Sequence, residues 1–512
     1  MTRTCGTAVR TSILIAGIFC GLGAVVAQAR AADVAPSAPA GSMANRLEPG
    51  VRALFAAGLA PGMQVAVVKD GAVVYAQAFG VADVDTKRPV GSDTKFYIAS
   101  TTKTLTALAT ASLAARGEVD LDAPISRYLP ALKLKEPLAA ETISLRDLLT
   151  HTHGISNDGP VTFLVAYTGD YTKSRLMKLL EEHGPAEHGR EYAYGNIGYN
   201  VAGMVLEAAT GKDWKELVER EVLIPAGMTH TTAYRSRAGD DLAMPHWLAV
   251  EGFRRVRFPK SDATMHAAGG HLATATDMAR YLQAHLGQGR INGRQVFPDA
   301  VIQETHRQQA AQDRKYAEYH RHGWGLGWDL GTYEADTLVH RFGGFFNAFH
   351  SHLSFMPRRG LGVVVLVNNG MTGSMLASRV ANCIYDTLIE KPGAREKWST
   401  IAADGPHEAS AIRKKVAEDR ARRAARPQET AHPLRAYVGS YENPHYGRMS
   451  WALEHDRLIV RMGVIESDTE VYDGAKDQIR VELTGGGDVV TFECEGDEAV
   501  ALMYHGFRFE RR

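Results

Sequence analysis

Cysteine is scarce in this sequence, in which only four of 512 residues are cysteines. Cys5 and Cys20 lie in the first 31 residues, while Cys383 and Cys494 lie far apart in the rest of the chain. A small disulfide-stapled scaffold is therefore excluded, and a disulfide between the last two is permitted but not required. With 45% apolar residues, the chain can fold around about two or three hydrophobic cores.

An excess of charge of either sign is also lacking, because 58 basic side chains balance 58 acidic ones. Binding to nucleic acid needs clustered lysine and arginine, so we expect no nucleic-acid partner. The basic run 413–426 also contains Glu418 and Asp419 and is interpreted as a solvated helical linker.

Long apolar runs are lacking apart from Ile13–Val26, which is shorter than the roughly 20 residues that cross a bilayer. Arg3 and Arg10 flank the start of this run and small residues follow it, a pattern typical of a secretory signal peptide over residues 1–31. Cleavage removes three arginines and no acidic residue, so the mature chain is slightly acidic. We expect a secreted or periplasmic bacterial protein with no membrane span in the mature chain.

The composition of the chain divides it into further segments. Residues 32–48 are rich in Pro and Ala and are interpreted as a flexible linker. Residues 49–392 show the sequence patterns of strands, then of helices, then of strands again. This order predicts an α+β domain with helices packed on one antiparallel sheet. Residues 393–433 are expected to form a charged helical linker. Short alternating segments with regular turns predict an all-β barrel domain over residues 434–512.

Individual elements support the α+β prediction. Two Val-rich runs flank Asp70-Gly71, which is a strong hairpin signal. The run Leu361–Asn368 is apolar throughout and predicts a strand buried on both faces. Leucines at helical spacing predict a helix that follows Ser100 and stops at Gly117.

The sharpest chemical signal is the pair Ser100 and Lys103 at the start of this helix. A spacing of three residues places both side chains on one helix face. A hydroxyl becomes a good nucleophile when a base takes its proton, and a buried lysine has the lowered pKa that this requires. The same spacing recurs at Ser92 and Lys95, but that copy lies in a turn, and Ser100 is the preferred nucleophile.

A second signal is Tyr194-Gly-Asn196, which comes directly before a predicted helix. A tyrosine near cations can share its proton, and the amide of Asn196 can orient both Lys103 and the substrate. The spacing recurs at Tyr441 and Asn443 in the β-rich tail, where a tyrosine in a strand core is the simpler interpretation.

The third signal is the segment His340-Arg341-Phe-Gly343-Gly344. Glycines allow a strand to pass close to a bound acyl group, and a backbone N–H there can join that of Ser100 in an oxyanion hole. The two glycines are therefore candidate substrate-binding residues.

Four segments of the chain resemble the class C β-lactamase-related family of penicillin-recognising serine hydrolases. They are Arg88–Lys103, Leu148–Gly154, Tyr194–Asn196 and Ala268–Thr274. The family includes DD-peptidases, D-aminopeptidases and esterases of one β-lactamase/DD-peptidase-like fold. The resemblance implies that Ser100 is acylated and that Lys103 and Tyr194 move protons. It assigns residues 49–392 to the hydrolase domain, and residues 434–512 resemble the lipocalin-like barrel of several D-peptidases in the family.

In the family that the chain resembles, a third motif of Lys or His, then any residue, then Gly binds the substrate carboxylate. The resemblance therefore makes Arg341 and His340 candidate substrate-binding residues, but this chain departs from the pattern. Arg341 stands where Lys or His is usual, and His340 lies one residue too early. An arginine can bind a carboxylate but cannot act as a base, so proton transfer must depend on Lys103 and Tyr194. Phe345 and Phe346 follow the glycines and indicate an apolar site, which favours peptide or ester substrates over β-lactams.

Other classes of function remain open. His151 and His153, with Asp158 after them, are a weak pattern for zinc, and a zinc site needs three or four ligands. An α/β-hydrolase is disfavoured because no Gly-x-Ser-x-Gly elbow occurs in the chain. A cell-wall or peptide-binding protein of the same fold without turnover is the non-enzymatic alternative. We expect no cofactor and no metal. The expected substrate is a small molecule or a peptide, with the cell wall as one source.

Overall fold

The computed structural model describes residues 40–157 and 159–512. The expected signal peptide at 1–31 and the first part of the expected linker lie outside these residues. The rest of that linker differs from the expectation, because helix α1 spans Ala40–Ala56. Leu47, Val51 and Leu54 recur at helical spacing on α1 and are completely or almost completely buried. This apolar stripe stabilises a helix where composition alone indicated a flexible tether.

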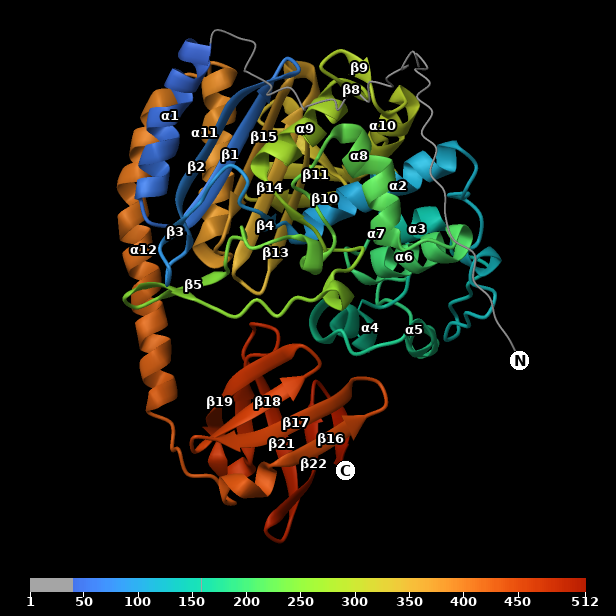
Figure 1. Cartoon of the computed structure of the whole chain (residues 1–512), viewed down its shortest axis with the longest axis vertical. Helices are drawn as coiled ribbons and strands as arrows, with labels where there is room; N and C mark the ends of the chain where they lie inside the picture. The colour runs from blue at the N-terminus through green and yellow to red at the C-terminus, as the bar shows by residue number, and fades with distance from the viewer. Residues whose placement is uncertain (1–39, 158) are drawn as a thin grey trace, which may run out of the picture. The chain divides into compact units, whose positions relative to one another are not determined.

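A nine-stranded antiparallel sheet forms the centre of the α+β body, in the order β10-β11-β12-β13-β14-β15-β1-β2-β3 (Figure 1). The predicted hairpin at Asp70-Gly71 is confirmed as β1 and β2, and the predicted buried strand is confirmed as β15. The strand bounds are β1 Gly62–Lys69, β2 Ala72–Asp83, β3 Arg88–Pro89, β10 Ala310–Tyr316, β11 Tyr319–Trp324, β12 Asp329–Tyr333, β13 Asp336–Phe345, β14 Phe349–Met356 and β15 Leu361–Val367.

Helices cover both faces of this sheet. On β15, Val363 and Val365 belong to the core shared with α1, α11 and α12, whereas Val364 and Leu366 belong to the core shared with α2 and α9. Successive side chains of a strand point to opposite faces, so a strand covered on both sides is apolar throughout. The remaining helices are α2 Thr102–Ala115, α3 Leu145–Thr150, α4 Pro160–Phe163, α5 Lys173–Leu180, α6 Ile197–Thr210, α7 Trp214–Val218, α8 Ile224–Ala226, α9 Ala275–Leu286, α10 Asp299–His306, α11 Met371–Leu388 and α12 Ala394–Ala424.

Three short two-stranded ribbons complete the α+β body. They are β4 Phe96–Tyr97 with β7 Leu272–Ala273, β5 His246–Ala249 with β6 Gly252–Arg255, and β8 Arg290–Ile291 with β9 Arg294–Gln295. The first of them lies immediately before Ser100 in the chain. It joins the start of α2 to the segment that follows His271, because Ile98 N donates to His271 O at 3.0 Å.

The C-terminal strands form a closed eight-stranded antiparallel barrel in which each strand pairs with the next. Pairing of β16 with β23, as at Tyr441 and Arg511, closes it. Tyr441, Trp451 and Phe492 are buried in its core. The strands are β16 Gly439–Asn443, β17 Gly447–Glu454, β18 Arg457–Met462, β19 Ile465–Asp473, β20 Gln478–Val481, β21 Asp488–Glu495, β22 Glu498–Tyr504 and β23 Phe507–Arg511. The predicted fold class, an α+β body with a C-terminal lipocalin-like barrel, is confirmed.

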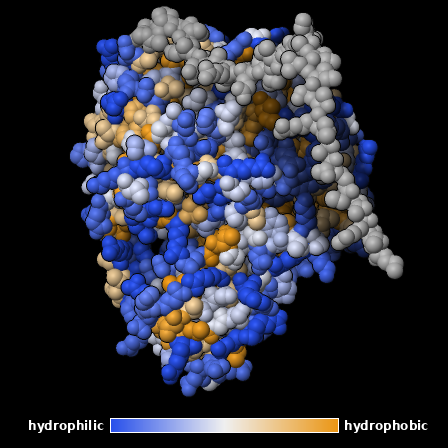
Figure 2. Space-filling view, viewed as in Figure 1, coloured by the Kyte–Doolittle hydropathy of each residue, from blue (hydrophilic) through white to orange (hydrophobic). Residues whose placement is uncertain are grey.

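The surface in Figure 2 is mainly hydrophilic, and apolar residues occur on it in small groups. Within the described residues, none of the helices has the length and apolar character that a membrane crossing requires. Cys383 and Cys494 are both free thiols.

Candidate active site

Ser100 lies where the chain turns from β4 into helix α2. The connecting 3-10 turn spans Ala99–Thr101, and Ala99 has a left-handed backbone with φ of 44°. A non-glycine residue rarely adopts this conformation, so surrounding contacts must hold it. Ser351 supplies one of them, because its hydroxyl donates to Ile98 O at 2.7 Å. Ser100 is thereby fixed at the start of the helix with a half-buried side chain.

Lys103 lies one helical turn after Ser100 and is completely buried. Its Nζ donates to Ser100 Oγ at 3.2 Å, to Asn196 Oδ1 at 2.7 Å and to the carbonyl of Ala268 at 2.8 Å. All three acceptors are uncharged. Burial lowers the pKa of Lys103 from 10.5 to about 8, although Tyr194 opposes the shift. The amine is therefore partly neutral near physiological pH and can accept a proton.

Tyr194 contacts the same serine. Its Oη donates to Ser100 Oγ at 3.0 Å and accepts a hydrogen bond from Arg341 Nη2 at 2.5 Å. Burial by itself raises the pKa of this phenol, but the positive charges of Arg341 and Lys103 outweigh it and bring the pKa from 10 down to about 8. Tyr194 is also 37% exposed, so the phenol borders solvent. Two groups that exchange a proton near pH 8 thus meet at Ser100.

A single side chain positions the Tyr194–Asn196 segment. Asn157 Oδ1 accepts hydrogen bonds from Asn196 N at 2.7 Å and from Ile197 N at 3.2 Å, at the start of α6. A Cβ on Gly195 would lie 2.5 Å from the same oxygen, so only glycine fits there. Asn157 therefore fixes both the tyrosine and the amide that contacts Lys103.

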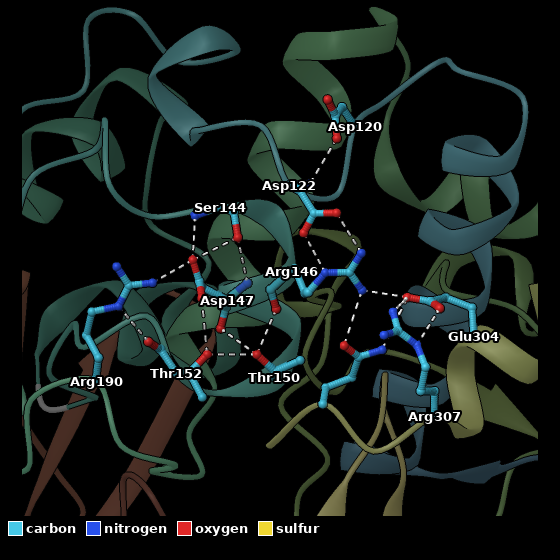
Figure 3. Close-up of polar contacts among 11 residues, drawn as sticks. Asp120, Asp122, Ser144, Arg146, Asp147, Thr150, Thr152, Arg190, Glu304 and Arg307 are labelled. Atoms are coloured by element: carbon cyan, nitrogen blue, oxygen red, sulfur yellow. Dashed lines mark hydrogen bonds and ion pairs between the residues drawn. The ribbon is translucent and has the colours of Figure 1, made fainter. Parts of the chain in front are cut away.

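An ionic network, drawn in Figure 3, anchors the segments on either side of Asn157. Asp147 closes a capping box with Ser144 at the start of α3 and pairs with Arg190 Nη2 at 2.7 Å. Arg190 also donates to Thr152 O at 3.2 Å and so ties the segment before Tyr194 to the loop after α3. The network holds the two loops that carry the Tyr194 side of the site.

Arg341 comes from the central strand β13 and is 6% exposed. Its Nη1 donates to Asp329 Oδ2 at 2.9 Å, and its Nη2 contacts Tyr194. Asp329 is fully buried and lies on the neighbouring strand β12. The guanidinium also lies 5.2 Å from the ring of Trp324. Arg341 is therefore held by a carboxylate of the chain itself and directs its charge at the phenol.

The side chain of His340 lies outside the Ser100 cluster, although His340 directly precedes Arg341 in the chain. It is completely buried, and its ring packs against Tyr319 at 5.2 Å and Phe342 at 4.7 Å. Burial lowers the pKa of His340 well below its usual value, with Arg321 adding to the effect. Of the two cationic candidates for the third motif, Arg341 contacts the Ser100 cluster and His340 packs among aromatic rings.

The two glycines of β13 differ in their surroundings. A Cβ on Gly343 would lie 2.1 Å from Ile98 O and 2.9 Å from Ser100 N, so the close approach of β13 to the serine requires glycine. A Cβ on Gly344 would meet only Phe349 O, at 3.8 Å. The backbone N–H of Ser100 therefore lies beside Gly343, where the oxyanion hole was expected.

Aromatic side chains form a wall beyond these glycines. The ring of Phe345 lies 5.0 Å from that of Tyr97 and 5.7 Å from that of Tyr167. A cavity of about 320 Å³ opens beside Gly344 and Phe345, and its lining includes Tyr167 and Phe346. Phe345 and Phe346, which the sequence placed near the site, both line this cavity together with polar backbone and side-chain atoms.

The histidines considered for zinc take part in the packing of the site. His151 accepts from Gly195 N at 3.4 Å and lies between Tyr194 and Trp324, with ring distances of 4.8 and 4.7 Å. His153 Nδ1 accepts from Ile155 N at 3.0 Å. Burial lowers the pKa of both rings. Asp158 lies outside the described residues.

The alternative motif copies lie away from the cluster. Ser92 is exposed in a turn and donates to Asp93 at 3.2 Å. Tyr441 is completely buried in barrel strand β16. Sequence reasoning missed Asp329, Asn157 and Ser351, because each acts on a segment far away in the chain and has no local motif.

Comparison with known protein families identifies the class of protein to which this fold belongs. The family model described as Beta-lactamase matches residues 51–379, which is more than half of the chain. The chain belongs to the β-lactamase family.

Among curated proteins, the chain is similar to Protein flp of Staphylococcus aureus strain COL, with 28% identity over 355 residues. The alignment covers 67% of this chain and 65% of Protein flp, so the chain spans somewhat less than two thirds of that relative. Penicillin-binding protein 4 of Amycolatopsis lactamdurans is also 28% identical, over 61% of this chain and 82% of its own length.

Among solved structures, the fold is similar to that of the octameric penicillin-binding protein homologue from Pyrococcus abyssi, with a TM-score of 0.58 and 22% identity. That similarity covers 91% of this chain and 99% of the homologue. The structure of SurE gives a TM-score of 0.56 at 20% identity, over 92% of this chain and 99% of SurE. At this identity the similarity concerns the fold.

Proposed function

We propose that this protein is an exported serine hydrolase that forms an acyl-enzyme at Ser100. One observation carries the proposal: Ser100 Oγ lies 3.2 Å from Lys103 Nζ and 3.0 Å from Tyr194 Oη, and the pKa of each partner is about 8. A hydroxyl flanked by two such groups has both a base for its proton and a donor for the leaving group. The signal-like residues 1–31 support export to the periplasm or medium.

The proposed acylation begins when the Lys103–Tyr194 pair has lost one proton. The pair then accepts the proton of Ser100 while Oγ bonds to the substrate carbonyl carbon. Collapse of the tetrahedral intermediate breaks the bond to the leaving group, and the pair returns the proton to that group. Water completes the cycle by attacking the ester carbon with the same pair as base, which releases the acid and restores Ser100.

The role of each remaining group follows from its position. Asn196 orients the Lys103 amine and can contact the substrate. The N–H of Ser100, close to Gly343, is proposed to donate to the carbonyl oxygen as negative charge develops there. Arg341 lowers the pKa of Tyr194, because a positive charge stabilises the phenolate. The carboxylate-binding role expected for Arg341 would compete with Asp329, which already binds its Nη1.

We propose peptides with D-amino acids or carboxylic esters as substrates, rather than β-lactams. The aromatic side chains packed around Phe345 favour an apolar acyl group. Substrate turnover by the purified chain tests the proposal, with a D-alanyl peptide, a p-nitrophenyl ester and a chromogenic cephalosporin as alternatives. Turnover of the first or second that is lost in Ser100→Ala supports it. A folded protein that turns over none of them supports the binding-protein alternative.

A further inference from the structure

A histidine, an aspartate and a cysteine come together in the C-terminal part of the chain. One ligand atom each from His432, Asp477 and Cys494 lies within 4.8 Å of the other two. Within residues 40–157 and 159–512, this is the one group of three histidine, cysteine, aspartate or glutamate residues whose ligand atoms have the spacing of a metal site. None of the three residues belongs to the Ser100 cluster, so their proximity needs a separate explanation.

The fold brings the three residues together from separate segments. His432 lies in the connection between α12 and the barrel, and Ala431 N donates to Gly474 O at 2.8 Å there. A Cβ on Gly474 would lie 1.8 Å from Glu429 O, so the connection passes the barrel at a point that only glycine permits. The cluster is thus built where this connection lies directly against the barrel.

The other two ligands sit at irregular points of the barrel. Asp477 has a left-handed backbone, with φ of 52°, immediately before β20. Cys494 lies on β21 at a shift in the register with β22. Such bulges redirect a side chain, and they are frequent next to functional sites. Both irregularities place a potential ligand toward the connecting segment.

Hydrogen bonds already order part of the cluster. His432 Nδ1 lies 3.1 Å from Asp477 Oδ1, and the same carboxylate oxygen accepts a short hydrogen bond from Tyr437 Oη. The edge of the Tyr437 ring also faces the imidazole. A residue that forms a hydrogen bond with a metal ligand, without itself binding the metal, orients that ligand for the ion. All three candidate ligands are half-buried, so an ion can reach them from solvent.

We propose that His432, Asp477 and Cys494 form a binding site for Zn²⁺ that fastens the connecting segment to the barrel. Nitrogen, oxygen and thiolate sulfur together are a donor set typical of zinc, and three protein ligands leave a fourth position for water. Tetrahedral coordination needs the ligand atoms about 3.3–3.8 Å apart, so the observed spacing requires only a small inward movement. Binding releases the thiol proton to solvent. This site lies outside the proposed hydrolase chemistry and departs from the expected absence of a metal.

Cobalt titration of the purified full chain tests the site, because Co²⁺ substitutes for zinc and reports a bound thiolate through charge-transfer absorption. We expect one equivalent of Co²⁺ to produce this absorption in chelator-treated protein and Zn²⁺ to abolish it. The absorption should be absent in Cys494→Ser and in His432→Ala. Cys383→Ser is the matched control, because Cys383 is the other cysteine of the described chain and its side chain is buried in the core on helix α11.

One decisive outcome comes from the wild-type chain alone. A wild-type chain that binds no Co²⁺ with thiolate absorption overturns the proposal. The proposal is also overturned if the thiolate absorption persists in folded Cys494→Ser or disappears in folded Cys383→Ser. A Zn²⁺-dependent rise in the melting temperature of wild type that is lost in Asp477→Asn supports the fastening role, and no rise overturns that role. Ester or peptide turnover by Ser100 is a separate readout, so failure of one proposal is distinguishable from failure of the other.

Discussion

Arg341 Nη2 donates a hydrogen bond to Tyr194 Oη at 2.5 Å, across 147 positions of the chain. The contact suggests a role for Arg341 at the position where the family resemblance led us to expect lysine or histidine. Arginine cannot relay a proton, but its permanent charge lowers the pKa of the phenol that contacts Ser100. Asp329 holds the guanidinium in place through Nη1. We propose that Arg341 acts through its charge and that Tyr194 and Lys103 transfer the proton.

Replacement of Arg341 by alanine should slow turnover of every substrate. Loss of its charge raises the pKa of Tyr194 and of Lys103, so less of the pair is in its basic form at pH 7. We expect kcat/KM to fall by about 10–100-fold, corresponding to a shift of one to two pKa units. The ascending limb of the pH profile should move to higher pH. Arg358→Ala, at an exposed position, is the control.

Comparison of substrates separates the two roles considered for Arg341. Equal losses for a neutral ester and for a substrate with a free carboxylate agree with a charge that acts on Tyr194. A much larger loss for the carboxylate-bearing substrate would restore direct binding of that carboxylate by Arg341.

The pH dependence of wild-type turnover follows from the two lowered pKa values. The Lys103–Tyr194 pair must lose one proton to act as a base, so activity is low when the pair is fully protonated and rises with pH through about 8. Lys103→Arg keeps the positive charge but cannot release a proton, and we expect a loss of about 10²–10⁴-fold. Steady-state rates between pH 5 and 10 measure the pH profile of the wild type and the loss of activity in Lys103→Arg. A flat profile would remove the pair from the rate-limiting proton transfer.

The buried pair of Asp329 and Arg341 should matter for stability as well. Asp329→Asn leaves the Arg341 charge buried without its carboxylate, which typically costs about 3–5 kcal/mol. Asp329→Asn combined with Arg341→Met removes both charges and should recover much of this loss. Thermal melts of the three proteins measure the difference. A single variant as stable as wild type would show that the Asp329 carboxylate does not stabilise the buried Arg341 charge.

Adjacent glycines on β13 provide a matched pair of variants. Gly343→Ala places a methyl group 2.1 Å from Ile98 O, so the strand and the Ser100 turn must separate. We expect a destabilisation of about 1–3 kcal/mol and loss of acylation. Gly344→Ala meets nothing closer than 3.8 Å and should behave like wild type. Melting temperature and ester hydrolysis test both; similar behaviour of the two variants would contradict the close approach of β13 to Ser100.

The features that sequence predicted are those encoded locally. Ser100 and Lys103 are separated by one helical turn, and the Asp70-Gly71 hairpin needs only its own residues. The barrel was also predictable, because each strand pairs with the next. Helix α1 was missed even though Leu47, Val51 and Leu54 carry a helical period, since its flanking Pro and Ala suggested a linker.

The parts of the site that sequence did not predict depend on tertiary contacts. Asp329 reaches Arg341 from another strand, and Asn157 reaches the backbone of Asn196 across 39 positions. Neither residue lies in a recognisable sequence motif. The different surroundings of His340 and Arg341 follow from the direction in which strand β13 presents each side chain, which requires the sheet register.

Covalent labelling followed by intact mass measurement tests the central proposal most directly. The wild-type chain, Ser100→Ala and Ser92→Ala are each incubated with a fluorophosphonate and with a p-nitrophenyl ester, after circular dichroism shows that all are folded. We expect one adduct on wild type and on Ser92→Ala, mapped by peptide analysis to Ser100, and none on Ser100→Ala. An adduct that persists in Ser100→Ala, or no adduct on wild type, would contradict the acyl-enzyme at Ser100.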